Sequence, residues 1–293
     1  MKLMKSLVII ATIIAVAPLA SVYAEDAFTI STDQIYGHKA GMALTFDVIR
    51  PTENANGVGL LYMVSGGWVS RYFDLERAMS DSGNQRGRFS SLVDRGYTLF
   101  MVRHGSSPYF KVPDAVKDVR RALRYIRYHA ADFGVDPERL GVFGGSAGGH
   151  LSLMLGTTSD NGDSDSKDPI SRTPARVAAV VAYFPPVDLR KSVGPSDRFP
   201  ALDFDPDLAA SISPILHVTA DDPPTLLVHG DKDTLVPLSN SERIHAAFEA
   251  VNVVSHLIVL EGAGHGFRGE HGSQAAAALT DWFDRYLLRQ STE

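Results

Sequence analysis

The spacing of hydrophobic and polar positions changes several times along the chain. Two stretches of alternating apolar and polar residues come first, and glycines lie between them. Alternation with a period of two around such a gap predicts a β-hairpin. Further along, short continuous apolar runs are typical of strands that are buried on both faces of a parallel sheet. The hairpin is predicted at 28–35 and 42–49, and the buried strands at 58–64, 97–102, 140–144, 177–184, 225–230 and 256–262.

Helical spacing is found between these runs. Apolar residues recur at steps of three and four over 112–133, with lysine and arginine between them and Pro113 near the start, which predicts an amphipathic helix. Strands that alternate with helices predict an α/β fold with a mostly parallel central sheet and helices on both of its faces. Other helices are predicted at 151–156, 241–251 and 274–288.

Two segments do not follow this alternation. The segment 185–224 lacks clear periodicity, and we expect it to form a small cap or a long loop over the sheet edge. The polar segment 159–168 is rich in aspartate but lacks the spacing of an EF-hand, so we expect a solvated loop rather than a metal site. No proline- or serine-rich linker is found, so residues 25–293 are expected to form a single domain.

The first 24 residues differ in character from the rest. Two lysines precede an uncharged apolar run at 7–17, and Val22-Tyr23-Ala24 provides a small-x-small pattern before two acidic residues. This order predicts a cleavable signal peptide and therefore export, either to a periplasm or out of the cell. A retained membrane anchor is the alternative, but the apolar run is short for crossing a bilayer. We therefore expect no stable membrane insertion after cleavage.

Composition limits the partners that the chain is expected to bind. The formal net charge is −6, and it becomes −8 when residues 1–24 and their two lysines are removed. An acidic chain without basic blocks is not expected to bind nucleic acid. The absence of cysteine excludes disulfides, a cysteine nucleophile and thiolate ligands for a metal. Composition leaves the oligomeric state open.

The chemistry is indicated first by Ser146, which has five glycines around it. The motif Gly144-Gly145-Ser146-Ala147-Gly148 fits G-x-S-x-G and lies between a predicted strand and a predicted helix. This is the context of a nucleophile elbow, where glycines allow a strained turn that exposes the serine hydroxyl. A plain glycine turn is the alternative.

A serine hydroxyl needs a base that accepts its proton. His265, in the glycine-lined loop EGAGHGF after a predicted strand, is the preferred candidate. His245 falls inside a predicted helix, His271 lies beyond the loop, and His229 ends a strand. A solvent-exposed loop histidine without a catalytic role remains the alternative for His265. As a base it must be neutral, so activity is expected to fall at acid pH.

An acid that orients the base is expected after the preceding strand. Asp231 and Asp233 both follow the apolar run at 225–230, and Asp188 follows the strand before that. Each lies at the sheet edge where Ser146 is expected. The acid would hold the imidazole tautomer and stabilise the imidazolium.

Amide donors are needed for the negative charge that develops on the carbonyl oxygen. The Ala147 N–H follows the nucleophile directly, and Gly66 and Gly67 follow the predicted strand at 58–64. An ordinary turn is the alternative for these glycines. Trp68 is expected either to line the substrate pocket or to pack in the interior.

Taken together, these motifs resemble the α/β-hydrolase superfamily, and in particular small carboxylesterases of the hormone-sensitive-lipase, acetyl-esterase and feruloyl-esterase types. The likeness covers nearly all of 25–293 and is carried by DPERLGVFGGSAGGHLSL, PPTLLVHGDKDTLVP and GAGHGF. The second segment matches the family pattern HGxxDxxVP, in which the later aspartate is catalytic. The resemblance therefore implies Asp233 as the acid, with Asp231 in local turn hydrogen bonds.

One part of the chain departs from the family. Many members carry HGGGW at the oxyanion loop, whereas this chain has Val64-Ser65-Gly66-Gly67-Trp68. The chain also resembles the catalytic domain of prolyl-oligopeptidase-type peptidases, but we do not expect their additional propeller domain here.

The resemblance implies hydrolysis of carboxylic esters through an acyl-enzyme, without a metal or organic cofactor. Small or soluble esters are expected as substrates, such as short acyl groups on sugars. Two alternatives remain open, a serine peptidase and an inert binding protein on a hydrolase scaffold.

Overall fold

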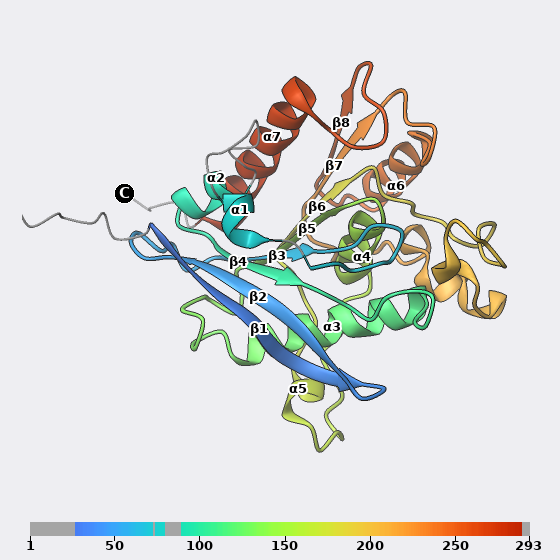
Figure 1. Ribbon diagram of the computed structural model, residues 1–293. Helices are drawn as coiled ribbons and strands as arrows, with labels where there is room; N and C mark the ends of the chain where they lie inside the picture. The colour runs from blue at the N-terminus through green and yellow to red at the C-terminus, as the bar shows by residue number, and fades with distance from the viewer. Residues whose placement is uncertain (1–26, 73, 80–88, 289–293) are drawn as a thin grey trace, which may run out of the picture.

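The fold is described by a computed structural model that places residues 27–72, 74–79 and 89–288 (Figure 1). The predicted signal peptide at 1–24 lies outside the described residues. Within the described part of the chain, no helix combines the length and the apolar composition that crossing a membrane requires.

A single twisted sheet of eight strands runs through the described residues, in the order β1-β2-β4-β3-β5-β6-β7-β8. β1 and β2 form the predicted antiparallel hairpin, and β2 also pairs antiparallel with β4. All later pairings are parallel, because each connection, with one or more α-helices in every case except the segment between β6 and β7, returns the chain to the same edge of the sheet. The predicted hairpin and the six predicted strands are confirmed. Their bounds are β1 Phe28–Lys39, β2 Met42–Pro51, β3 Gly59–Met63, β4 Thr98–Val102, β5 Leu140–Gly145, β6 Ala179–Tyr183, β7 Thr225–Gly230 and β8 Ser255–Leu260.

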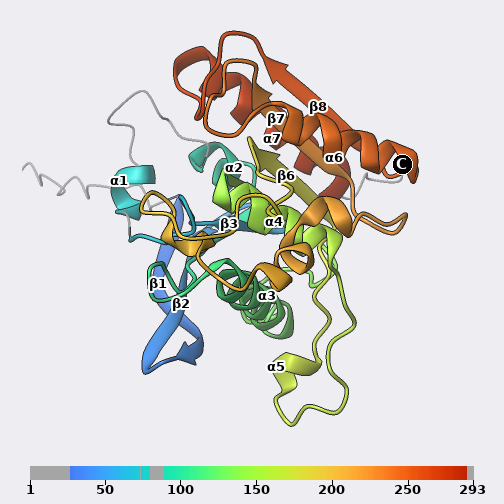
Figure 2. The ribbon, with the colours of Figure 1, turned by 90° about the vertical axis from the view of Figure 1, so that its right-hand side faces the viewer.

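Helices cover both faces of this sheet, as Figures 1 and 2 show. The apolar sides of α3, α4 and α6 contribute to the core on one face. Those of α1, α2 and α7 contribute to the core on the other face. The predicted α/β fold is therefore confirmed, whereas the short helices α1, α2 and α5 were not predicted, since four or five residues show no periodicity. The helices are α1 Leu75–Met79, α2 Ser90–Asp94, α3 Val112–Tyr128, α4 Ala147–Thr157, α5 Pro169–Arg172, α6 Ser239–Ala250 and α7 Gly269–Leu287.

The segment 159–168 is more ordered by its charges than a solvated loop would be. Asp168 accepts a hydrogen bond from Arg121 at 2.6 Å, and Asp160 pairs with Arg124. Both arginines lie on the polar side of α3, whose apolar side is buried against the sheet. The expectation of a polar loop rather than a metal site agrees with the described residues, and the two ion pairs show in addition that both ends of the loop are held against α3.

Four short 3₁₀ turns occupy the segment 185–224, which was expected to be a cap or loop. Prolines begin three of them, where a fixed φ favours a tight helical turn. Their apolar side chains, including the buried Leu202 and Ile212, join the core on the α4 side of the sheet. Figure 2 shows this segment, in yellow to orange, passing beside α4 and α3. The 3₁₀ turns are Pro200–Leu202, Pro206–Leu208, Ala210–Ile212 and Pro214–Leu216.

Candidate active site

Ser146 occupies a strained turn between β5 and α4. Its φ of 55° and ψ of −121° are unusual for a residue with a Cβ atom. Gly144 and Gly148 touch across this turn, since a Cβ atom on Gly144 would lie 2.6 Å from the Gly148 carbonyl carbon. A Cβ atom on Gly148 would likewise lie 2.7 Å from the Met63 oxygen. The glycines therefore allow the turn to pack against its own helix and against β3.

His265 links Ser146 to Asp233 through its two ring nitrogens. Nε2 lies 3.0 Å from the Ser146 hydroxyl, and Nδ1 lies 2.7 Å from Oδ2 of Asp233. Because a carboxylate only accepts hydrogen bonds, the ring hydrogen is on Nδ1 and Nε2 is free to accept from the serine. The structure thus brings the three residues together in the order required for removal of a proton from the serine.

Asp233 is held rigidly behind the histidine. Its side chain is fully buried, and Oδ1 accepts hydrogen bonds from the amides of Leu235 and Val236, both at 2.9 Å. The neighbouring His229 donates from Nε2 to the Val236 carbonyl at 2.8 Å and accepts at Nδ1 from the Ser241 hydroxyl at 2.7 Å. Burial lowers the pKa of His229, so this ring supports the acid loop as a neutral group.

Asp231 connects the loop of the acid to the loop of the base. Its carboxylate accepts from the Gly262 amide at 2.6 Å and pairs with Lys232. The loops also touch at Gly230, where a Cβ atom would lie only 2.2 Å from the Ala263 oxygen. Asp231 therefore links the loop of Asp233 to the loop of His265, and the hydrogen bond to His265 comes from Asp233 instead.

The rival residues have partners elsewhere. Asp188 pairs with Arg190 and Arg243, and these guanidinium groups hold its pKa well below the usual range. His245 bonds to the Ser255 hydroxyl, and His271 bonds to the Glu261 carbonyl. Within the described part of the chain, no hydrogen bond joins any of these three residues to Ser146.

The predicted oxyanion loop, residues 64–70 and called the oxyanion loop below, differs in detail from the prediction. Gly66 and Val69 exchange backbone hydrogen bonds at 3.0 Å, with Gly67 at φ 58° and Trp68 at φ 56° between them. Positive φ at both central residues is the signature of a type I′ turn. The Gly66 N–H thus donates to the Val69 carbonyl, and the prediction that it donates to an oxyanion was wrong.

Two of the three predicted donor amides remain candidates. Ala147 is the first residue of α4, so its N–H has no partner within the helix. The Gly67 N–H donates to no acceptor among the residues that the structure describes. These are the candidate oxyanion donors.

Trp68 lies in the interior and does not line the site, so the prediction of a substrate contact was wrong. It is only 5% exposed, and its indole N–H donates to Nδ1 of His150 at 3.2 Å. Nε2 of His150 in turn contacts the Ile212 carbonyl at 2.8 Å. Burial lowers the pKa of His150 to about 4.

A second buried histidine holds the start of the same loop. The Ser65 hydroxyl lies 2.8 Å from Nε2 of His104, whose Nδ1 lies 2.8 Å from the Gly105 carbonyl. Burial also lowers the pKa of His104. The serine found where related loops have glycine therefore has a partner. Sequence reasoning missed both histidines, although His150, a polar residue inside an apolar helix, was a usable signal.

Two phenylalanine rings, rather than Trp68, lie beside His265 and the oxyanion loop. The Phe184 ring lies 4.6 Å from the His265 ring, centre to centre. The Phe199 ring lies against Gly67, since a Cβ atom there would approach it to 3.2 Å. Phe184 thus packs against the base, and Phe199 against the loop that carries the candidate oxyanion donor.

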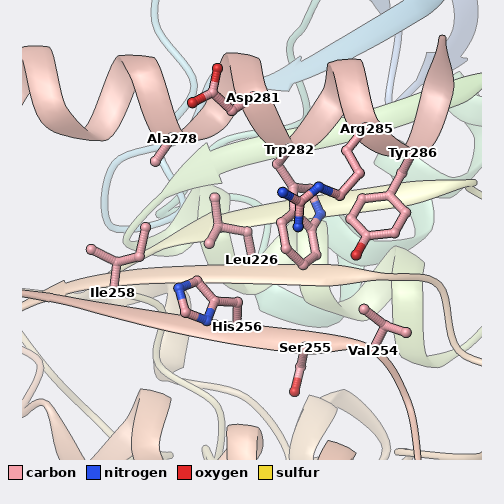
Figure 3. A pocket seen from close by; sticks show the side chains of 10 residues that line it. All are labelled: Leu226, Val254, Ser255, His256, Ile258, Ala278, Asp281, Trp282, Arg285 and Tyr286. Carbon is pink, nitrogen blue, oxygen red and sulfur yellow. The ribbon is translucent and has the colours of Figure 1, made fainter.

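A separate cleft lies away from these residues, between α7 and the sheet at β7 and β8. It has a volume of about 420 Å³, and Figure 3 shows Trp282 and Arg285 of α7 facing His256 of β8. Ser146, Asp233 and His265 do not line it. Among the described residues, no cluster of three or more histidine, aspartate or glutamate side chains is arranged to hold a metal ion.

Comparison with known proteins adds independent findings. The BD-FAE family profile matches residues 46–248, and that of the TAP-like protein family matches 209–292. The probable carboxylic ester hydrolase LipM of Mycobacterium tuberculosis is 30% identical over 210 residues, 66% of this chain and 45% of the relative. Esterase LipC of the same organism is 30% identical over 193 residues, 61% of this chain and 47% of the relative. The chain thus spans about half the length of these curated relatives.

Solved structures give a similar result. A truncated form of carbohydrate esterase from gut microbiota is 28% identical, with a TM-score of 0.70, and the match covers 89% of this chain and 98% of that one. Esterase 2 of Thermogutta terrifontis is 24% identical, with a TM-score of 0.71, and the match covers 92% and 96%. The second likeness concerns the fold alone.

Proposed function

The chain belongs to the BD-FAE family and has the α/β-hydrolase fold, and on this premise we propose that it is a serine hydrolase that cleaves carboxylic esters. The observation that carries the proposal is the hydrogen-bonded series from Ser146 through His265 to the buried Asp233. The esterase relatives support the reaction type, and the series supplies residues for each of its steps.

The reaction follows from this geometry. Nε2 of His265 takes the Ser146 proton as the hydroxyl oxygen attacks the ester carbonyl, and Asp233 stabilises the imidazolium that forms. The carbonyl oxygen gains negative charge, which the amides of Ala147 and Gly67 stabilise. His265 then gives the proton to the leaving alcohol. Water repeats the sequence on the acyl-enzyme and releases the acid.

Esters with small acyl groups are the substrate class that we favour. The ring of Phe184 packs against the base and that of Phe199 against Gly67, and from this aromatic bulk we infer a preference for short acyl chains over long ones. The solved neighbour described as a carbohydrate esterase favours acyl groups carried on sugars. The signal-peptide pattern at 1–24 is in keeping with an exported enzyme that meets such esters outside the cytoplasm.

Labelling with a fluorophosphonate tests the nucleophile, and a panel of p-nitrophenyl esters from acetate to decanoate tests the substrate class. We expect the label at Ser146 by mass spectrometry, with kcat/KM highest for acetate or propionate. Ser146→Ala should lose labelling and turnover, whereas Ser171→Ala, which removes a hydroxyl bonded to Asp168 beside α3, should retain both.

Two outcomes would contradict the proposal. Faster cleavage of aminoacyl anilides than of any ester would favour a peptidase. A folded protein that neither labels nor hydrolyses any ester would favour a binding protein on a hydrolase scaffold.

A further inference from the structure

The side chain of His150 lies between two segments that flank the active site. On one side it contacts Trp68 of the oxyanion loop, and on the other it contacts the carbonyl of Ile212 in the 3₁₀ segment. It is fully buried and stands one helical turn after Ser146 in α4. The proposed reaction assigns no step to this ring.

The two contacts fix which nitrogen carries the hydrogen. A carbonyl only accepts, so Nε2 of His150 must donate to Ile212, which leaves Nδ1 as a lone pair. The indole of Trp68 only donates, and it is directed at that lone pair. The ring is therefore matched to both partners as a neutral group.

The oxyanion loop needs a stabilising contact such as the Trp68–His150 hydrogen bond, because its backbone conformation is unfavourable by itself. Trp68 has a positive φ, which a residue with a Cβ atom seldom adopts. It is the next residue after Gly67, so a contact that holds the indole also restricts the backbone of Gly67. At the other end of the loop, the Ser65 hydroxyl is bonded to His104.

We propose that His150 is a positioning residue for ester hydrolysis, which holds the Gly67 amide at the oxyanion by accepting the indole N–H of Trp68. The inference rests on the proposed function, because it concerns the same oxyanion. It also assigns the Trp68 contact, rather than the Ile212 contact, as the one that affects the rate.

Two substitutions separate the contacts. In His150→Asn the side-chain oxygen is attached at Cγ, as Nδ1 is, so it can still accept from Trp68 but does not reach Ile212. In His150→Gln the amide nitrogen lies near the place of Nε2, so it can still donate to Ile212 but does not accept from Trp68.

We expect His150→Gln to lower kcat for p-nitrophenyl acetate by about 10- to 100-fold, with KM changed less than about threefold, because the oxyanion interaction strengthens in the transition state. Fluorophosphonate labelling of Ser146 should slow in parallel. His150→Asn should stay within about threefold of the parent in kcat. The acid side of the pH–rate profile should be the same in all variants, since His265 is untouched.

Trp68→Phe provides an independent arm, because it removes the indole donor and leaves His150 in place. It should lower kcat by the same factor as His150→Gln, and the double variant should be no slower than either single one. Thr157→Val is the matched control, since it removes a buried hydroxyl bond to Leu153 at the far end of α4. We expect its kcat to be unchanged.

Equal losses of kcat in His150→Asn and His150→Gln would overturn the inference, as would a parental kcat in His150→Gln. If either His150 variant fails to fold, a parental kcat in Trp68→Phe overturns it, and a 10- to 100-fold loss at unchanged KM supports it. Failure of the parent protein to label and hydrolyse would instead contradict the proposed function.

Discussion

The strained backbone of Ser146 predicts that glycine at this position gives a more stable protein than alanine does. At φ 55° and ψ −121° a Cβ atom costs about 1–3 kcal/mol, and glycine removes that cost. Glycine also loses about 0.4–1 kcal/mol more chain entropy than alanine on folding. Ser146→Gly should therefore be more stable than Ser146→Ala by about 0.5–2 kcal/mol, which reverses the usual order of these two residues.

The comparison between the two variants isolates the backbone, because both lose the hydroxyl that contacts His265. Urea unfolding at pH 7.5 followed by circular dichroism gives the free energy of unfolding of each. In thermal scans the glycine variant should have the higher melting temperature, by about 2–4 °C for each kcal/mol of difference in the free energy of unfolding. Neither variant should hydrolyse esters.

A control for this comparison lies in the same helix. Ser152 is buried in α4 and is absent from the residues with positive φ. There, Ser152→Gly should be less stable than Ser152→Ala by about 0.5–1 kcal/mol. If alanine were also the more stable residue at position 146, the turn would store no strain and the reasoning would be refuted.

Three further predictions concern the neighbouring groups. Asp233→Asn should lower kcat by about 10³- to 10⁴-fold, because the amide disfavours the tautomer that His265 needs, whereas the kcat of Asp231→Asn should stay within about tenfold of the parent value. Equal losses of kcat in steady-state assays would contradict the assignment of Asp233 as the acid. Gly230→Ala should lower the free energy of unfolding in urea by about 1–3 kcal/mol and kcat at least tenfold, because the new Cβ atom would meet the Ala263 oxygen. A parental kcat would show that the loops carrying Asp233 and His265 can move apart without affecting catalysis. Burial lowers the pKa of His150 from 6.5 to about 4, so the unfolded chain binds a proton at this ring before the folded protein does, and the free energy of unfolding should fall by about 3 kcal/mol as the pH drops from 6.5 to 4. Between pH 7 and 4 the free energy of unfolding should therefore fall less steeply for His150→Asn than for the parent, and equal slopes would contradict this.

Much of the fold was available from the sequence because it depends on local spacing. Apolar runs of five to eight residues defined the central strands, and the step of three and four residues defined α3. The elbow at Ser146 was likewise readable, since its glycines and its place between strand and helix are close together in the chain. The short helices and 3₁₀ turns were not readable, because segments of three to five residues carry no period.

The roles of single residues were decided by tertiary structure wherever a partner comes from a distant segment. Trp68 bonds to His150, 82 residues away in the chain, and Ser65 bonds to His104, 39 residues away. No local pattern therefore showed that the indole is buried or that the oxyanion loop is held by two histidines. The Gly66 amide was lost as a donor only because the chain turns back at Val69. The sequence by itself thus determined which residue types meet at the carboxyl edge of the sheet. Packing between segments far apart in the chain decided which of their donors and acceptors remain free for substrate.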